Sequence, residues 1–273
     1  MMENHDWSSF KNSPDAPYIN QTLLPAFAHA ENYRTGGIYP SLPNYIALEA
    51  GNNFGLLNQS PLPTQFRIAT TDHLTTYLAN SGIAWKSYSE RLPGGGTVCP
   101  LTEVTFYSLD HNAWVYFDDV TGNPPRADSA YCIQHIRPYS EFASDLQNDT
   151  VGRYNFIIPD DLDQGEKHVT SGSSLVAQTD TWLAAEVPRI LASQAYLNGG
   201  VLIILWDESA HHGVDNPIGC IVVSPLAKTG YANTIAYSHG STLRTVQEIL
   251  GVAPLLGSAA TATDLSDLFT SFP

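Results

Sequence analysis

A continuous apolar run, Val-Leu-Ile-Ile-Leu-Trp at residues 201–206, is followed directly by Asp207 and Glu208. A run that is apolar at every position predicts a strand buried on both faces, as central strands of parallel sheets are. Open α/β sheets bind ligands at the carboxyl ends of their strands, so the two acids are candidate site residues. Adjacent acids can reach one divalent cation through hard oxygen ligands. The alternative is a strand-end acid that caps the next helix.

The rest of the chain alternates short apolar runs with amphipathic stretches, which predicts an α/β fold. Asp180 is the expected N-cap of one helix, and Gly199-Gly200 follows its end. Residues 93–149 are mostly loop, so we expect one domain over residues 1–273 with a loop-rich cap or insertion around 93–149. The predicted strands are 83–88, 155–159, 201–206 and 219–224, and the predicted helices are 42–50, 72–81, 180–197 and 241–250.

Charge narrows the range of partners. The net charge is −15, from 27 acidic and 12 basic residues. This excludes a basic nucleic-acid footprint and disfavours an anionic membrane surface. An acidic protein suits cations, although a solvated acidic surface explains most such charge. An anionic phosphate substrate requires a local inversion of the field, which a bound metal provides.

The three cysteines and the N-terminal segment indicate in which cellular compartment the protein folds. Cys220 lies in an apolar run and is expected to be a buried free thiol, while Cys99 and Cys132 flank a polar stretch and could pair. Residues 201–206 are far too short to span a membrane. Because a candidate site residue stands third from Met1, we expect a strand or a signal segment upstream. A secreted or periplasmic protein is the preferred interpretation.

Further polar groups could join Asp207 and Glu208. Asp160, Asp161 and Asp163 follow the predicted 155–159 strand, with Glu166 and His168 close behind. Acids followed by a histidine predict a possible second metal site, formed by Asp160, Asp163 and His168, and the alternative is an acidic surface loop.

Ser41 lies between Pro40 and Pro43, just before a predicted helix. A hydroxyl at this position is near helix N-terminal amides, which favour a bound anion. Taken alone, such a serine is more often an N-cap. No Gly-x-Ser-x-Gly elbow occurs, which disfavours an α/β-hydrolase triad. His111 and His239 could bind phosphate or metal, or could be structural histidines.

Together these segments resemble the phosphoesterase family of bacterial acid phosphatases and phospholipase C enzymes, within the alkaline-phosphatase superfamily. The resemblance is closest to small secreted acid phosphatases. The matching segments follow the family's order along nearly the whole chain: Met2-Glu3-Asn4-His5, Pro40-Ser41-Leu42-Pro43-Asn44-Tyr45, Ala50-Gly51-Asn52-Asn53-Phe54-Gly55, Trp85-Lys86-Ser87-Tyr88-Ser89-Glu90, His111-Asn112, Ile158-Pro159, Asp180-Thr181-Trp182-Leu183, Trp206-Asp207-Glu208, and Ser238-His239 with Leu243-Arg244-Thr245.

The resemblance implies a three-layer sandwich with a mainly parallel central sheet, and a catalytic divalent metal ion (Ca, Mg, Mn, Zn or Fe). It implies that Ser41 is the nucleophile, that Cys99 and Cys132 form a disulfide, and that the partner is a small phosphorylated substrate. The implied metal ligands are Glu3, Asn4, Ser41, Asp207 and Glu208, and the implied phosphate-pocket residues are Asn44, His111 and His239. His239 or His111 would protonate the leaving group.

The chain departs from the family pattern in two places. The family usually shows Asn-Asp-x-His-Asp after the Ile-Pro strand end, whereas here the segment 160–168 reads Asp-Asp-Leu-Asp-Gln-Gly-Glu-Lys-His. Tyr39 also stands where close relatives often have histidine. The expected reaction is hydrolysis of phosphoric monoesters through a phosphoserine. The alternatives are a phospholipase C-type phosphodiesterase and a catalytically silent binding protein, whereas the absent Cys/Ser-x-Pro-x-Arg signature disfavours a sulfatase.

Overall fold

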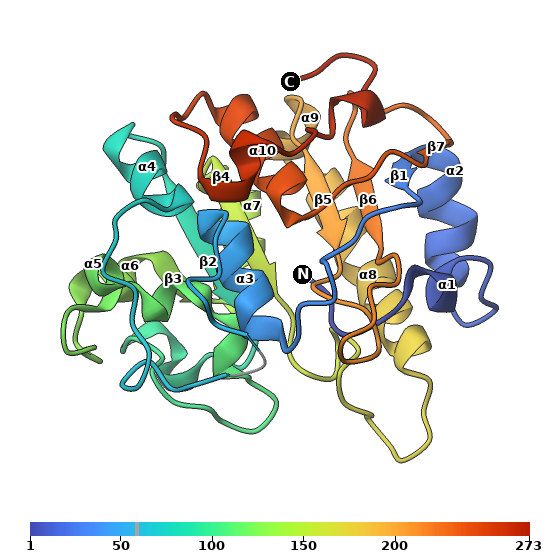
Figure 1. Ribbon diagram of the computed structural model, residues 1–273. Coiled ribbons are helices and arrows are strands. Elements are labelled where there is room, and N and C mark those ends of the chain that lie inside the picture. The colour runs from blue at the N-terminus through green and yellow to red at the C-terminus, as the bar shows by residue number, and fades with distance from the viewer. Residues whose placement is uncertain (58–59) are drawn as a thin grey trace.

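Two β-sheets stand side by side in the middle of the molecule, with helices in front of them and behind them (Figure 1). The computed structural model describes residues 1–57 and 60–273. One sheet has the order β3-β2-β4 and the other the order β5-β6-β1-β7. The strands are β1 (Ala28–Ala30), β2 (Trp85–Ser89), β3 (Ile136–Pro138), β4 (Tyr154–Ile158), β5 (Leu202–Leu205), β6 (Cys220–Val223) and β7 (Tyr231–Asn233).

Parallel pairing dominates. β2 pairs in parallel with both β3 and β4, and β1 pairs in parallel with β7. β6 is antiparallel to both of its neighbours, β5 and β1. The expected α/β sandwich with a mainly parallel sheet is confirmed. The expectation for 201–206 was wrong in one respect, because β5 is not a central parallel strand: it lies at the edge of its sheet and pairs antiparallel with β6.

The helices form the outer layers. α3 and α10 contact each other in front of the sheets, and α8 lies behind them (Figure 1). α3 lies between two buried apolar clusters, since Leu42 and Ile46 belong to one and Leu48 to the other. The helices are α1 (Trp7–Phe10), α2 (Leu24–Ala26), α3 (Ser41–Ala50), α4 (Leu74–Asn80), α5 (Asp118–Thr121), α6 (Ala130–His135), α7 (Phe142–Gln147), α8 (Leu175–Leu191), α9 (Gln194–Leu197) and α10 (His239–Leu250).

The expected N-cap of α8 was wrong. The helix begins at Leu175, and the Ser174 hydroxyl caps it by accepting the Ala177 amide at 3.2 Å. Asp180 is instead buried in the helix, where its carboxylate accepts the backbone amides of Tyr18 and Ile19 at 2.9 and 2.8 Å. Ser caps a helix N-terminus as well as Asp does, so the sequence is compatible with a helix that begins after Ser174 or after Asp180. The helix begins after Ser174, and the Asp180 carboxylate binds the backbone amides of the 18–19 segment instead.

Residues 93–149 contain short helices and loops, as expected, but they also supply strand β3 to a sheet. A disulfide joins Cys99 to Cys132, whose Cα atoms are 5.5 Å apart, which confirms the implied pairing. Cys220 is a buried free thiol, as expected. No helix in the described residues is long and apolar enough to cross a membrane.

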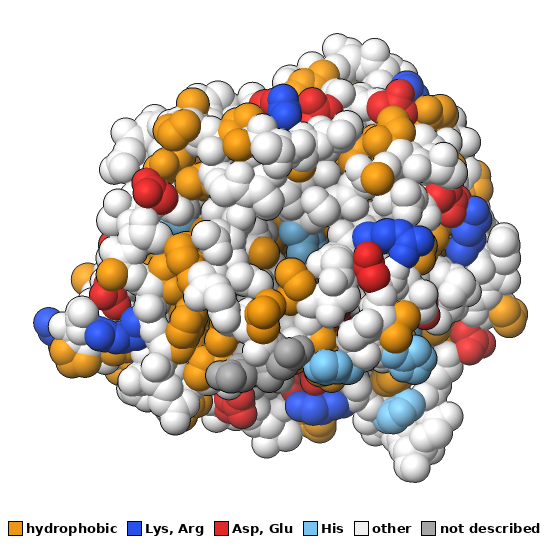
Figure 2. Space-filling model, in the orientation of Figure 1, with side chains coloured by type: hydrophobic (Ala, Val, Ile, Leu, Met, Phe, Trp, Pro, Cys, Tyr) orange, Lys and Arg blue, Asp and Glu red, His pale blue; other side chains and the backbone are white. Residues whose placement is uncertain are grey.

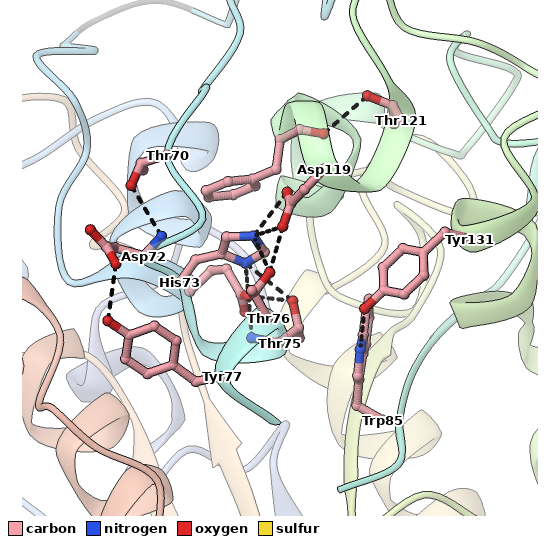
Figure 3. A network of polar contacts seen from close by, with 12 residues as sticks. Thr70, Asp72, His73, Thr75, Thr76, Tyr77, Trp85, Asp119, Thr121 and Tyr131 are labelled. Carbon is pink, nitrogen blue, oxygen red and sulfur yellow. Dashed lines mark hydrogen bonds and ion pairs between the residues drawn. The ribbon is translucent and has the colours of Figure 1, made fainter. Parts of the chain in front are cut away.

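A buried histidine fastens this region to α3 (Figure 3). The His73 ring contacts the Glu49 carboxylate near the end of α3 at 2.8 Å and the Asp119 carboxylate in α5 at 3.0 Å. The backbone amide and the hydroxyl of Thr75 donate hydrogen bonds to the Glu49 carboxylate, at 2.8 and 2.6 Å. Burial by itself lowers the pKa of His73, but the hydrogen bonds to Asp119 and Glu49 outweigh it and raise the pKa to about 9. His73 is therefore a charged link between three helices.

This link makes stability depend on pH. A pKa raised from 6.5 to about 9 in the folded state contributes stability that is complete below about pH 6.5 and is lost as the pH rises through 9. We expect His73→Gln to abolish this pH-dependent part of the free energy of unfolding, which is on the order of 3 kcal/mol. Urea unfolding curves recorded between pH 6 and 10 measure it. The exposed His211→Gln should keep the wild-type dependence. An unchanged slope in His73→Gln would contradict the charged state.

Candidate active site

Strand pairing brings the acids of distant segments together. Met2 forms a parallel bridge with Trp206, its amide donates to the Leu205 carbonyl at 2.8 Å, and its carbonyl accepts the Asp207 amide at 3.0 Å. Because Met2 and Trp206 lie opposite each other, the residues that follow them, Glu3 and Asp207, emerge at the same edge. The Asn4 amide then donates to Asp207 Oδ1 at 3.1 Å. The Asp160–His168 loop begins after β4 at the same edge, where the Gln164 carbonyl accepts the Glu3 amide at 3.1 Å.

Ser41 is the first residue of α3 and lies against this acidic cluster. Its Oγ donates to Glu3 Oε2 at 2.8 Å, and the side chain is only 4 % exposed. The N-cap alternative was wrong, because the N-cap residue is Pro40 and no side chain caps this end. Asn44 lies one turn later and donates to Glu208 Oε2 at 2.9 Å. Because no side chain caps this end of α3, its first backbone amides lack a side-chain acceptor, an arrangement that favours an anion.

Three buried carboxyl groups lie beside the serine without a Lys or Arg partner. Glu3, Asp207 and Glu208 are each at most 1 % exposed, and no Lys or Arg among the described residues forms an ion pair with them. Burial, then the charge of Asp207, raises the pKa of Glu3 well above its usual range and the pKa of Glu208 to about 10. Burial also raises the pKa of Asp207. Such crowding is costly unless protons or a cation compensate it.

Unpartnered oxygens agree with a cation site. Asn4 Oδ1, Asp207 Oδ2 and Glu208 Oε1 are buried and have no hydrogen-bond partner. An all-oxygen set that includes carboxylates matches the preference of hard divalent ions. The residues therefore fit a divalent metal. The Glu208 carboxylate points toward Asn44. In the described residues, Glu3, Asp207 and Glu208 therefore do not bring one ligand atom each within 4.8 Å of one another.

His111 lies next to the serine and Glu3. Its ring stacks on Tyr45 with centroids 5.3 Å apart, and Nε2 is 3.5 Å from Glu3 Oε2. The side-chain amide of Gln164 lies 3.0 Å from Nδ1, so Nε2 is the ring nitrogen that faces the site. His111 also forms a group of possible ligands with Asp161 and Glu166, all within 4.8 Å of one another.

His239 occupies a different position, behind the acids. Its Nε2 donates to the Asp207 backbone carbonyl at 2.7 Å, and its Nδ1 accepts from the Tyr33 hydroxyl at 3.1 Å. Burial lowers the pKa of His239 to about 4, so the ring is neutral at ordinary pH. With both nitrogens engaged, His239 holds the backbone of the Asp207–Glu208 turn in place.

The Asp160–His168 loop divides into separate parts. Asp160 and Asp163 join Glu90 in a second group of carboxylates within 4.8 Å of one another. Within that group the carboxylates are largely satisfied, since Asp160 accepts from Arg91 and Glu90 accepts the Asp160 amide. His168 is exposed and does not join them; its Nδ1 lies 2.6 Å from the Ser173 carbonyl oxygen.

The sequence argument did not assign roles to two residues of the site. Tyr45 donates its hydroxyl to Glu3 Oε1, and its spacing of one helical turn from Ser41 places it on the same face of α3. That spacing was a usable signal. Gln164 contacts His111 and donates to Asp161 Oδ1 at 3.3 Å. Nothing in the sequence marked Gln164, because loop conformation decides which side chain turns inward.

Histidines also occur near the surface of this region. His212 is exposed and packs edge-on against Tyr39, with ring centroids 4.8 Å apart, next to the turn that carries Ser41. Figure 2 shows histidine side chains gathered near the lower edge of the visible face, beside acidic and basic side chains. This local mixture differs from the acidic character of the chain as a whole.

Comparison with known proteins places this geometry in a family. The model of the phosphoesterase family matches residues 6–253. The chain is 28 % identical over 275 residues to a phosphatidylinositol-3-phosphatase of Mycobacterium tuberculosis, covering 98 % of this chain and 80 % of that protein. It is 26 % identical over 228 residues to an acid phosphatase of Aspergillus fumigatus, covering 80 % of this chain and 47 % of that protein.

Solved structures show the same fold at low identity. A protein of the alkaline phosphatase superfamily from Vibrio parahaemolyticus superposes with a TM-score of 0.58 at 10 % identity, over 98 % of this chain and 70 % of that one. Human ectonucleotide pyrophosphatase/phosphodiesterase 5 gives a TM-score of 0.55 at 10 % identity, over 99 % and 98 %. With a family match over most of its length and phosphatases among its relatives, the chain belongs to the phosphoesterase family and is a phosphoric ester hydrolase.

Proposed function

We propose that the chain is a metal-dependent phosphomonoesterase that acts through a phosphoserine at Ser41. The observation that carries this proposal is the Ser41 hydroxyl, which donates to buried Glu3 at 2.8 Å and sits at an uncapped helix N-terminus beside unpaired acids. A nucleophile, an acidic ligand set and oriented amides are the parts that phosphoryl transfer requires. The phosphatase names of two relatives support a monoester substrate.

The residues that would hold the divalent ion are Glu3, Asn4, Ser41, Asp207 and Glu208. Their orphaned oxygens favour a hard ion such as Ca²⁺, Mg²⁺ or Mn²⁺. When bound, the ion supplies Lewis acidity, which lowers the pKa of a serine hydroxyl and neutralises phosphate charge. Asp161 and Glu166 lie beside His111, which contacts Glu3, and these two carboxylates extend the set of possible ligands. The Glu90, Asp160 and Asp163 group is already satisfied internally, and we assign it a structural role.

The reaction follows from the positions of the side chains. Ser41 Oγ gives its proton to the Glu3 carboxylate that it contacts and attacks phosphorus, so that a new oxygen–phosphorus bond forms and the ester bond to the alcohol breaks. His111, acting as an imidazolium, transfers the proton on Nε2, the nitrogen that faces the site, to the departing alkoxide and is left as a neutral ring. Water then hydrolyses the phosphoserine and releases phosphate. Asn44 and the first amides of α3 bind the phosphate oxygens during both steps.

His239 acts as a positioning residue in this scheme. Both of its ring nitrogens are engaged, and its low pKa leaves no proton to transfer from the ring as an acid at ordinary pH. Its bond to the Asp207 carbonyl fixes the turn on which two ligands lie. The role of leaving-group acid therefore falls to His111.

The protein would act on small phosphorylated compounds outside the reducing cytosol. The Cys99–Cys132 disulfide closes the loop-rich 93–149 region, and such bonds persist in oxidising compartments. A secreted or periplasmic location suits this bond.

Replacement of the nucleophile is the first test. Ser41→Ala should lower turnover of a generic aryl phosphate monoester by roughly a thousandfold or more, because the covalent route is lost. It should also abolish the phosphoenzyme trapped by acid quench and detected by mass spectrometry. Ser209→Ala is the matched control, since this buried hydroxyl on the neighbouring turn donates to the Val214 carbonyl instead of to Glu3. Normal turnover in Ser41→Ala would refute the assignment, and preference for a diester or a choline phospholipid would favour a phosphodiesterase.

Metal dependence is tested by removal and return of the ion. Dialysis against a chelator should abolish hydrolysis, and titration with Ca²⁺, Mg²⁺ or Mn²⁺ should restore it. Glu208→Gln should lower the affinity for the ion that restores activity by about tenfold or more, because the substitution removes a ligand charge from a buried site. Glu103→Gln, at an exposed acid, should behave as wild type. Full activity after exhaustive chelation would contradict metal dependence.

A further inference from the structure

Gln164 is a buried residue that joins two parts of the candidate active site. It lies on the loop that follows β4, and its side chain is fully buried. Its backbone carbonyl accepts the Glu3 amide at 3.1 Å, and its backbone amide donates to the Asp160 carbonyl at 2.9 Å. Its side-chain amide nitrogen lies 3.0 Å from His111 Nδ1. One residue therefore contacts both the segment that carries Glu3 and the ring of His111.

The side-chain contact selects one of two orientations of the His111 ring. Tyr45 fixes the plane of the ring, because the two rings stack with 12° between their planes. A half-turn of the imidazole preserves that plane but exchanges each nitrogen with a carbon atom. Nε2 lies 3.5 Å from Glu3 Oε2, too far for a strong hydrogen bond, so Glu3 selects the orientation only weakly. The contact at Nδ1 selects it, because a carbon atom there would leave the buried amide of Gln164 without this partner.

The Gln164 side chain is itself held in place. Its Nε2 lies 3.3 Å from Asp161 Oδ1, and the Asp161 carboxylate also accepts from Lys167. A primary amide carries an acceptor as well as donors, so it can contact Nδ1 of His111 whether or not that nitrogen carries a proton. Among the described residues, the His111 ring has no other hydrogen bond. The orientation of the ring therefore depends on this one side chain.

We propose that Gln164 is a positioning residue for phosphoryl transfer, whose side-chain amide holds the His111 ring in the orientation that directs Nε2 toward the departing alcohol. This inference rests on the proposed role of His111 as the leaving-group acid. The alternative is a purely structural role, in which Gln164 ties its loop to Glu3. That contact is made by backbone atoms, so it survives a change of side chain, and the two roles can be separated.

The acidity of the leaving alcohol distinguishes a positioning role from a structural one. An ester of an acidic alcohol, such as 4-nitrophenyl phosphate, expels its alkoxide with little need for a proton, whereas an ester of a weakly acidic alcohol, such as ethyl phosphate, requires one. A residue that orients the acid therefore affects ethyl phosphate more than 4-nitrophenyl phosphate. A residue that only stabilises the loop affects both esters equally. The ratio kcat/KM is the quantity to compare, because it includes the step in which the alcohol leaves.

Gln164→Met removes the amide and nearly keeps the length of the side chain. It should lower kcat/KM for ethyl phosphate by about tenfold, because a hydrogen bond to the ring is lost, and for 4-nitrophenyl phosphate by less than about threefold. The inhibition constant of inorganic phosphate should not change, because this probe has no leaving group. Gln178→Ala is the matched control, since Gln178 Nε2 donates to the carbonyls of Leu162 and Lys167 and holds the same loop without contacting His111. Any loss in this control should be equal for the two esters.

His111→Asn separates this inference from the proposed function. It should discriminate between the two esters more strongly than Gln164→Met, which should add no further discrimination in the His111→Asn background. Equal losses on both esters in Gln164→Met, with discrimination present in His111→Asn, would overturn the role of Gln164 alone. Equal losses in His111→Asn would overturn the acid assignment and this inference with it. If Gln164→Met does not fold, Gln164→Asn decides by the same comparison, because its amide is one methylene too short to reach Nδ1.

Discussion

Three buried carboxyl groups that no Lys or Arg of the described residues pairs with impose the dominant electrostatic constraint on this fold. Glu3, Asp207 and Glu208 are almost fully removed from water, and burial raises the pKa of each. Isolated charges of this kind are too costly to retain for packing alone, and hydrogen bonds from Ser41, Asn44 and the Asn4 amide satisfy only some of the oxygens. A divalent ion would neutralise the cluster and would attract the phosphate that the acidic surface of the chain otherwise repels.

The surrounding structure holds that cluster at one edge of the sheets. The Met2–Trp206 bridge sets Glu3 beside Asp207, and the N-terminus of α3 brings Ser41 to the same point. Behind these groups, His239 fixes the Asp207 backbone. At the far end of α3, the His73 link ties Glu49 to α4 and α5, so the helix that carries Ser41 is held at both ends.

Local sequence patterns predicted much of this arrangement. The apolar run before Asp207 predicted a strand, the prolines around Ser41 predicted a helix start, and both elements are present. The position of a strand within its sheet was harder to predict, because an apolar sequence indicates that the strand is buried but does not indicate which strands lie beside it. β5 is apolar along its whole length yet lies at an edge of its sheet, so its sequence did not reveal its position.

The site was predicted less evenly than the fold. Asp207 and Ser41 became candidates from their positions at a strand end and a helix start, whereas Asn44 was assigned only through the family resemblance. Loop residues could not, since Gln164 turns inward while His168 turns to solvent, and their order along the chain gives no sign of this. His239 lies next to the Asp207 backbone, and its two hydrogen-bond partners favour a positioning role over an acid–base role. The sequence alone could not distinguish these two roles.

Anomalous X-ray diffraction from crystals grown with Mn²⁺ tests the central claim most directly. The account predicts a peak bounded by carboxylate oxygens of Glu3, Asp207 and Glu208, at roughly 2.0–2.6 Å from its ligands, next to Ser41 Oγ. The peak should disappear after soaking with a chelator. The absence of any peak between Glu3 and Asp207, or a peak only at the Glu90–Asp160–Asp163 group, would contradict it.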